Sequence, residues 1–294
     1  MTSASLEVVQ APRSRTRRLL GRVSRGPLHA FLIIVALAWM VPTFGLLVTS
    51  FRESGDISAS GWWNVFTHPV QFTVGPYSSL LSDPNLVRAL FNTVLITLPA
   101  SILVVLIGAM AAYAFAWIKF PGRDTIFLIV VALLVVPLQM ALIPVASLYG
   151  VLNIFGSIWS AVLFHVAFGL PFAIFLLRNF FVGIPGELLE AARVDGAGEA
   201  RIFLQLVLPV GGPAIASLFI FQFLWTWNDL LVALVFVPGT NAPITVFIQS
   251  QMRNYGSNLD IIAPAAFLSL IVPLIVFFAF QRYFVQGVLA GAVK

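Results

Sequence analysis

Long runs of consecutive apolar residues constrain this chain more than any other feature. About twenty helical residues, each rising about 1.5 Å, cross the roughly 30 Å hydrocarbon core of a bilayer. Hydrocarbon offers the backbone no hydrogen-bond partner, so such runs are expected to be helices. The sequence therefore predicts an all-α, polytopic membrane protein with six transmembrane helices. The runs lie at about Leu28–Ser50, Leu86–Trp117, Thr125–Leu148, Ile158–Leu177, Leu206–Phe236 and Ile261–Phe284.

Composition supports this class. Hydrophobic residues make up 60% of the 294 residues and charged residues only 9%, with a mean hydropathy of +1.00. These values lie outside the range of soluble domains. The chain has no cysteine, so disulfide and thiol chemistry are excluded.

Charge placement orients the predicted spans. Lys and Arg in short loops stay on the cytoplasmic side, and an even number of spans puts both termini on the same side. With the N-terminus inside, only three of the 16 Lys and Arg residues would lie outside, namely Arg52, Arg88 and Arg253. We therefore expect a multi-pass protein with both termini cytoplasmic. The net charge of +5 then reflects membrane topology, and we expect no nucleic-acid partner.

This topology divides the chain into three parts. We expect a basic cytoplasmic tail at 1–27, a six-span domain at 28–284 and a cytoplasmic C-terminal tail at 285–294. Residues 1–27 hold a single acid, Glu7, which is also typical of a transit peptide or the start of a signal peptide. The first apolar run is longer than a secretory signal core, which favours an uncleaved anchor.

Aromatic and proline residues mark two further features of the spans. Trp62 and Trp63 in the first outer loop are typical of the membrane–water interface, and contact with an outer partner is the alternative. Pro137, Pro144 and Pro171 predict kinks that could act as hinges, although prolines are common in membrane helices.

The inner loop at about 181–205 contains residues that are typical of helix starts and helix ends. Pro185 suits the start of a helix, and Glu187 and Glu190 complement the positive end of its dipole. Gly196 is expected to end that helix, and a second one can start near Gly198. The loop is therefore predicted to form a helix–turn–helix at the inner surface.

The same loop carries a wider pattern that resembles the EAA loop of ATP-binding-cassette (ABC) importer permeases. Glu-Ala-Ala alone would be weak evidence, because these residues are good helix formers. The resemblance rests on a longer set in family register, placed between the fourth and fifth predicted spans. That set is Glu190, Ala191, Ala192, Asp195, Gly196, Ala197, Phe203, Leu206, Leu208, Pro209 and Pro213.

This resemblance implies that the loop meets a cytoplasmic ATPase. It implies no catalytic residue in this chain, whose sequence has no phosphate-binding Gly-Lys-Ser/Thr motif. ATP and Mg²⁺ would be bound by the partner, so no cofactor is expected here. The implied coupling residues are Glu187, Glu190, Ala191, Ala192, Asp195, Gly196, Ala197 and Arg201.

Three further segments resemble carbohydrate importers of the maltose and glycerol-phosphate permease type. They are Leu170–Phe175 with Arg178–Phe181, Trp225–Leu230, and Gln281–Gly287 with Gly291–Lys294. One departure is Gly212, where many relatives have a basic residue. The resemblance covers about 28–294 and implies a type I ABC importer permease fold in the inner membrane. It implies as partners a second permease subunit, an ATP-binding subunit dimer and an extracytoplasmic solute-binding protein.

Trp225, Asn228 and Asp229 are the candidates for the substrate path. In a continuous helix they would share one face, with an aromatic ring, an amide and a carboxylate that suit sugar hydroxyls. An ionised carboxylate in a span costs about 2.5–3.5 kcal/mol on insertion scales, so Asp229 should not face lipid. A structural contact between helices is the alternative to a path role.

Other functional classes find less support in the sequence. His29, His68 and His165 lie in different segments without metal-ligand spacing, so no metal site is expected. An ion-coupled secondary transporter would need repeated halves and more charges in mid-membrane. A membrane-embedded enzyme would need a nucleophile–base pair or a metal cluster. The alternative within the importer class is a permease for a solute other than a sugar.

Overall fold

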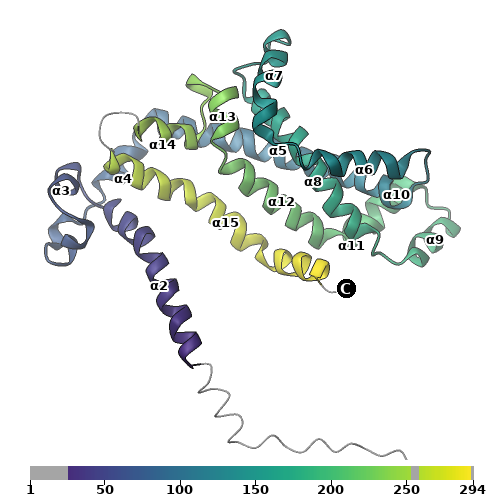
Figure 1. Ribbon diagram of the computed structural model, residues 1–294, viewed down its shortest axis with the longest axis horizontal. Helices are drawn as coiled ribbons and strands as arrows, with labels where there is room; N and C mark the ends of the chain where they lie inside the picture. Colours follow the sequence, from purple (N-terminus) through teal and green to yellow (C-terminus); the bar gives the residue numbers. More distant parts are fainter. Residues whose placement is uncertain (1–25, 253–257, 293–294) are drawn as a thin grey trace, which may run out of the picture.

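The computed structural model describes residues 26–252 and 258–292, and within this part the regular secondary structure is helical, without strands (Figure 1). The basic tail predicted at 1–27 lies almost entirely outside the described residues. The elements, in chain order, are α2 (Gly26–Thr49), α3 (Ser54–Ala59), η1 (Trp62–Phe66), η2 (Pro69–Gln71), α4 (Gly75–Leu81), α5 (Pro84–Trp117), α6 (Arg123–Leu133), α7 (Leu138–Val151), α8 (Ile158–Phe181), α9 (Gly186–Val194), α10 (Glu199–Ile202), η3 (Phe203–Val207), α11 (Leu208–Val210), α12 (Gly212–Trp227), α13 (Leu231–Phe236), η4 (Gly239–Asn241), α14 (Ile244–Met252) and α15 (Leu259–Ala292).

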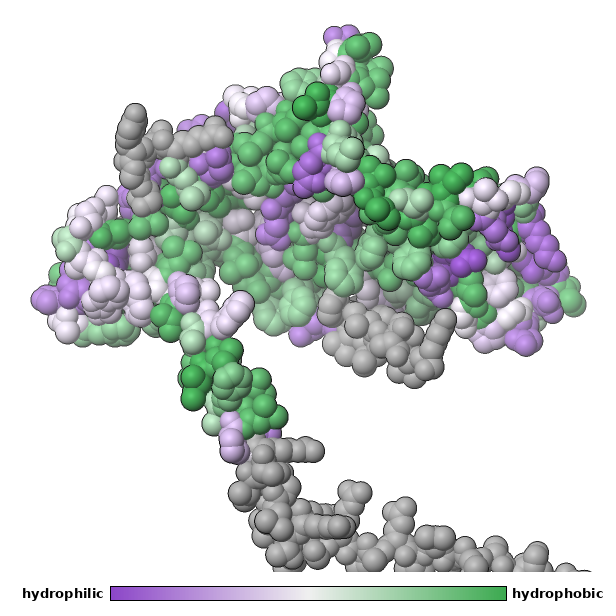
Figure 2. Space-filling view, viewed as in Figure 1, coloured by the Kyte–Doolittle hydropathy of each residue, from purple (hydrophilic) through white to green (hydrophobic). Residues whose placement is uncertain are grey.

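The apolar helices agree with the six predicted spans. In the described part, α2, α5, α8 and α15 are each long and apolar enough to cross a membrane. The number of candidate spans rises to six if each of two bent helix pairs is one span. These pairs are α6 with α7, and the α10–α11 segment with α12. Figure 2 shows hydrophobic residues over the middle of the molecule and hydrophilic residues gathered towards α3 at one end and α9 at the other.

The third span is broken in its middle. Helices α6 and α7 meet at 99°, and Pro137 stands at the start of α7. Proline lacks a backbone N–H and disfavours helical geometry in the residue before it, here Val136. The run Thr125–Leu148 is therefore two short helices, and α7 projects from the bundle (Figure 1).

The fifth span, predicted over Leu206–Phe236, is bent at its entry and broken near its end. The chain passes through the π-helical segment η3 and bends by 76° before α12, in the stretch that holds Pro209 and Pro213. Helix α12 then ends at Trp227, and a short non-helical stretch separates it from α13. The prediction of a single helical face through Asp229 was therefore wrong.

Close packing of α5 against α8 forms the centre of the bundle. A Cβ atom added to Gly108 of α5 would lie 2.8 Å from Cβ of Ala173 in α8. A Cβ atom on Gly169 of α8 would lie 2.6 Å from Oε1 of Gln222 in α12. Lipid provides no hydrophobic force between membrane helices, so their association depends on close packing. Small residues permit this packing because they let the two backbones approach closely. Helix α12 also packs against α5 and α15.

The loop after α2 is organised around Arg52, which is almost completely buried. Its guanidinium donates hydrogen bonds to the Asp56 and Ser60 carbonyls and to Oε1 of Gln71. These bonds fold α3 and η2 around the end of α2. Trp62 packs against Gly45 of α2, where an added Cβ would lie 2.7 Å from the indole Nε1.

We predict that Gly108→Leu destabilises the subunit, because the α5–α8 contact has no room for a larger side chain. Overpacking of this kind costs about 1–3 kcal/mol. The measurement is the thermal unfolding midpoint in detergent. Gly150→Leu is the matched control, since Gly150 is also helical but has no atom within 4 Å of an added Cβ. Equal midpoints for the two variants would contradict the close contact.

Candidate functional site

The inner loop forms the expected helix–turn–helix. Helix α9 starts after Pro185 and α10 starts after Gly198. Gly196 between them has φ of 83°, in the left-handed region. The Gly196 N–H donates to the Arg193 carbonyl and the Ala197 N–H to the Ala192 carbonyl, each at 3.0 Å. This pair of bonds is the Schellman termination of a helix, which favours glycine at the left-handed position.

One side of this hairpin is anchored in the bundle. Leu189 of α9 and Ile202 of α10 are almost completely buried, and Ala192 and Ala197 are half-buried against the same core. The two alanines therefore pack partly within the chain itself. The coupling candidates on the exposed side are Glu187, Glu190, Ala191, Asp195, Gly196 and Arg201. Val194, which sequence reasoning missed, is 87% exposed beside them.

An ionic contact closes the hairpin and joins it to α5. Nε of Arg193 lies 2.9 Å from Oε1 of Glu199, and the hydroxyl of Tyr113 in α5 donates to Oε2 of the same carboxylate. The Arg193 hydrogen bond, followed by that from Tyr113, lowers the pKa of Glu199 below its usual value. Both donors favour the charged form of the carboxylate. Sequence reasoning missed Tyr113, since a single tyrosine in an apolar run carries no pairing signal.

The start of the loop is also held by α5. Nε1 of Trp117 donates a hydrogen bond of 3.1 Å to the carbonyl of Phe181, the last residue of α8. The last turns of α5 therefore hold the chain where it leaves α8 and again where it returns at Glu199.

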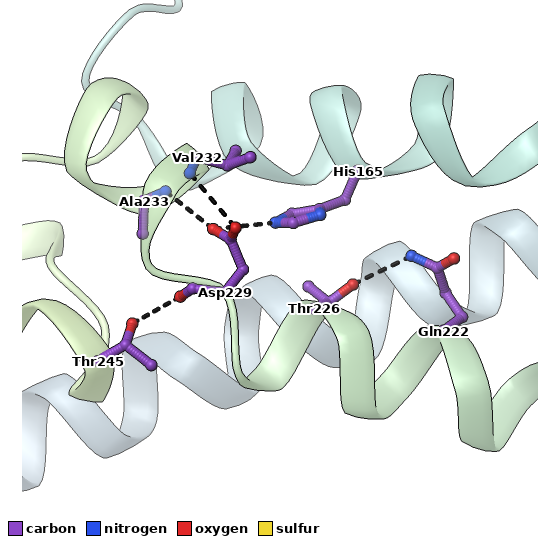
Figure 3. A network of polar contacts seen from close by, with 7 residues as sticks. All are labelled: His165, Gln222, Thr226, Asp229, Val232, Ala233 and Thr245. Carbon is purple, nitrogen blue, oxygen red and sulfur yellow. Dashed lines mark hydrogen bonds and ion pairs between the residues drawn. The ribbon is translucent and has the colours of Figure 1, made fainter. Parts of the chain in front are cut away.

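The three substrate-path candidates do not share a face. Trp225 and Asn228 are exposed, and Asp229 is turned inward with its side chain 12% exposed. The Asp229 carboxylate accepts hydrogen bonds from the Ala233 N–H at 3.0 Å and the Val232 N–H at 3.4 Å (Figure 3). It thus caps the first turn of α13, where four N–H groups lack partners within the helix.

Asp229 also ties α13 to two other elements. Its Oδ2 lies 3.7 Å from Nε2 of the buried His165 in α8. Its backbone carbonyl accepts a 2.7 Å bond from the Thr245 hydroxyl of α14. His165 in turn meets the Trp225 ring edge-on at 5.5 Å between centroids. This network explains how an acid is accommodated at the broken span (Figure 3).

The described residues around Asp229 leave little free space. Within residues 26–252 and 258–292, no three His, Cys, Asp or Glu side chains come together as a candidate metal site. The space beside His165 and Asp229 has a volume of about 10 Å³ and is lined also by Thr93, Thr97 and Thr226. That volume suits about one water molecule and excludes a sugar.

We predict that Asp229→Ala loosens the segment from α13 to α14, because the Val232 and Ala233 N–H groups would lose the carboxylate that accepts their hydrogen bonds. Loss of a helix cap costs about 0.5–2 kcal/mol. Limited proteolysis within 231–252 in detergent should become faster. Asn228→Ala is the control, since its exposed side chain bonds only to the Leu224 carbonyl one turn back. Equal cleavage rates in the two variants would contradict the capping role.

Comparison with known proteins agrees with these features. A family model described as "Binding-protein-dependent transport system inner membrane component" matches residues 104–290. The osmoprotective compounds uptake permease protein GgtD of Synechocystis sp. is 46% identical over 273 residues, 91% of this chain and 92% of that protein. The alpha-glucoside transport system permease protein AglG of Rhizobium meliloti is 48% identical over 238 residues, 78% of this chain and 62% of that protein.

A solved structure shows the same fold. A chain of a bacterial ABC transporter involved in the import of the acidic polysaccharide alginate superposes with a TM-score of 0.75 and 22% identity. The superposition covers 94% of this chain and 100% of that chain. The chain belongs to the family of inner membrane components of binding-protein-dependent transport systems.

Proposed function

We propose that this chain is the permease subunit of an ATP-driven importer for a glucoside or a related sugar derivative. The observation that carries this proposal is the α9–α10 hairpin. It is anchored on one side and presents Glu187 and Glu190 on the other. A rigid polar projection at the inner end of a membrane bundle suits docking to a soluble subunit.

In this proposal the ATPase chemistry belongs to separate subunits. An ATP-binding subunit dimer would bind ATP and Mg²⁺, and its closure would move the hairpin. The exposed Glu190 would form a charge-assisted hydrogen bond to that partner, and such bonds are stronger than neutral ones. The spans would then turn from an inward-facing to an outward-facing arrangement that accepts solute from the extracytoplasmic binding protein.

A second permease subunit would complete the path. Helix α2 leans away from the bundle (Figure 1) and buries only Gly45, Val48 and Thr49, so most of its surface is left for lipid or another chain. Trp225 and Asn228 are exposed on α12 and at its end. We propose that these two line the path, where the ring can stack on a sugar and the amide can bond its hydroxyls. Asp229 would hold this segment in place through its contacts with His165 and the start of α13.

The relatives named above support two solute classes. The alpha-glucoside permease AglG favours a glucoside, and the osmoprotective compounds permease GgtD favours an osmoprotectant, which includes non-sugar solutes. Binding of radiolabelled alpha-glucosides and of glycine betaine to the companion binding protein separates these classes. We expect binding of the glucoside.

The first prediction of this proposal concerns topology. Cysteines introduced singly at Ser79 and Gly198 occupy exposed positions at the two ends of the molecule, and the natural chain has no cysteine. An impermeant thiol reagent should label Ser79→Cys from outside intact cells and label Gly198→Cys only after permeabilisation. Labelling of Gly198→Cys in intact cells would overturn the six-span topology with cytoplasmic termini.

The second prediction concerns the hairpin as the coupling site. Glu190→Ala should reduce uptake by about tenfold or more, because a hydrogen bond to a charged group contributes about 1.5–3 kcal/mol. Gly196→Trp should have a similar effect, because a bulky side chain at positive φ adds about 1–2 kcal/mol of strain and obstructs docking. The measurements are solute uptake and ATPase stimulation by loaded binding protein in reconstituted complexes.

Gly156→Trp is the matched control for Gly196→Trp. Gly156 has φ of 81°, and an added Cβ there also has no atom within 4 Å, but it lies before α8, outside the hairpin. The control carries the same backbone strain and should keep coupled hydrolysis in each assembled complex. Normal uptake and normal stimulation in both hairpin variants would refute the coupling role.

A further inference from the structure

Helix α5 is fastened at both ends to segments that lie far apart in the sequence. At its inner end, the buried Tyr113 donates to Glu199 of the α9–α10 hairpin, and Trp117 donates to the Phe181 carbonyl. The Tyr113 ring also packs against Phe203 of η3, with centroids 5.3 Å apart. These contacts connect α5 directly to the start and the end of the proposed coupling loop.

The outer end of α5 holds the segment from η4 to α14 in a similar way. Nδ2 of the buried Asn92 donates to the carbonyls of Thr240 at 2.9 Å and Ala242 at 3.2 Å. The hydroxyl of Thr93 accepts a 2.9 Å bond from the Ile244 N–H. These side chains supply partners to backbone groups in and just after the short η4 turn. Such groups would be costly to leave unpaired where water is scarce.

Both sets of contacts lie on α5, which is a single helix of 34 residues. The axial separation of Asn92 and Tyr113 is about 31 Å at 1.5 Å per residue. The tight contact at Gly108 holds this stretch against α8. A displacement of the inner hairpin therefore acts on the same helix that positions the outer turn.

We propose that α5 is the mechanical link between the coupling loop and the outer turn at 239–244, with Tyr113 and Asn92 as the positioning residues at its two ends. This inference rests on the proposed coupling role of the hairpin. Movement of α9 and α10 passes through the Tyr113–Glu199 hydrogen bond into α5. Asn92 then carries that movement to the turn between α13 and α14, on the side expected to receive solute.

The test uses Tyr113→Phe and Asn92→Leu in the full reconstituted complex. The first change keeps the ring against Phe203 and removes only the hydroxyl, and the second keeps the side-chain size and removes the donor. The readout is the ratio of ATPase activity with and without solute-loaded binding protein. Each variant should lower this ratio by about tenfold, because Tyr113→Phe removes a hydrogen bond to a charged group and Asn92→Leu removes two hydrogen bonds to backbone carbonyls.

Tyr149→Phe is the control for Tyr113→Phe. Tyr149 is another buried tyrosine on α7, packed on Phe236 at the end of α13 with ring centroids 5.4 Å apart, and its replacement by Phe keeps this ring contact. It should keep the wild-type ratio. The unfolding midpoint and the yield of assembled complex are measured for every variant, so that a loss of coupling is separated from a loss of folding.

The double variant Tyr113→Phe/Asn92→Leu decides whether the two ends act through one link. Sites separated by more than about 10 Å normally have additive effects. If α5 is the link, the double variant should be no worse than the more impaired single variant. Additive losses would overturn the proposal, as would a wild-type ratio in Tyr113→Phe or a fall no larger than the loss of assembled complex.

The result also separates this inference from the proposed function. If Gly196→Trp abolishes coupling and Tyr113→Phe does not, the hairpin couples but α5 is not the link. If Gly196→Trp and Glu190→Ala both keep coupling, the proposed function itself is wrong.

Discussion

The structure depends on the requirement that backbone N–H and C=O groups in hydrocarbon find partners within the protein. Long helices such as α5 and α15 satisfy this requirement on their own. Where a span is interrupted, side chains must supply the missing partners. Asp229 does so for α13, and Asn92 does so for the turn at η4. Asp229, which looks like a ligand-binding group in the sequence, is therefore a residue that supports the fold.

Along the fifth span, the residue that supports the fold differs from the residues that are exposed and available for contact. Trp225 and Asn228 are exposed, whereas Asp229 is held by α13, His165 and Thr245. A division of this kind is common at functional sites, where groups that meet the solute are oriented by buried neighbours. The inner hairpin has the same organisation, with Leu189 buried and Glu190 exposed.

Local signals in the sequence predicted much of this arrangement. The six apolar runs and the turn at Gly196 follow from hydropathy and from glycine's tolerance of positive φ. The sequence indicates that Asp229 avoids lipid, but its capping of α13 could not be predicted, because this role depends on His165 in a different helix and on a break at Trp227 within an apolar run. The Tyr113–Glu199 contact was likewise hidden, since its partners are 86 residues apart. Contacts between distant segments carry no periodic signal.

The broken third span limits what can surround the bend between α6 and α7. The bend between α6 and α7 is solvent-accessible in the isolated chain, with Val135 82% exposed, yet it falls near the middle of a run long enough to cross the membrane. Irregular backbone at that depth is tolerated only against protein or a water-filled cavity, never against acyl chains. The backbone around Pro137 therefore requires protein or water beside it, and acyl chains are expected to contact other parts of the subunit's surface.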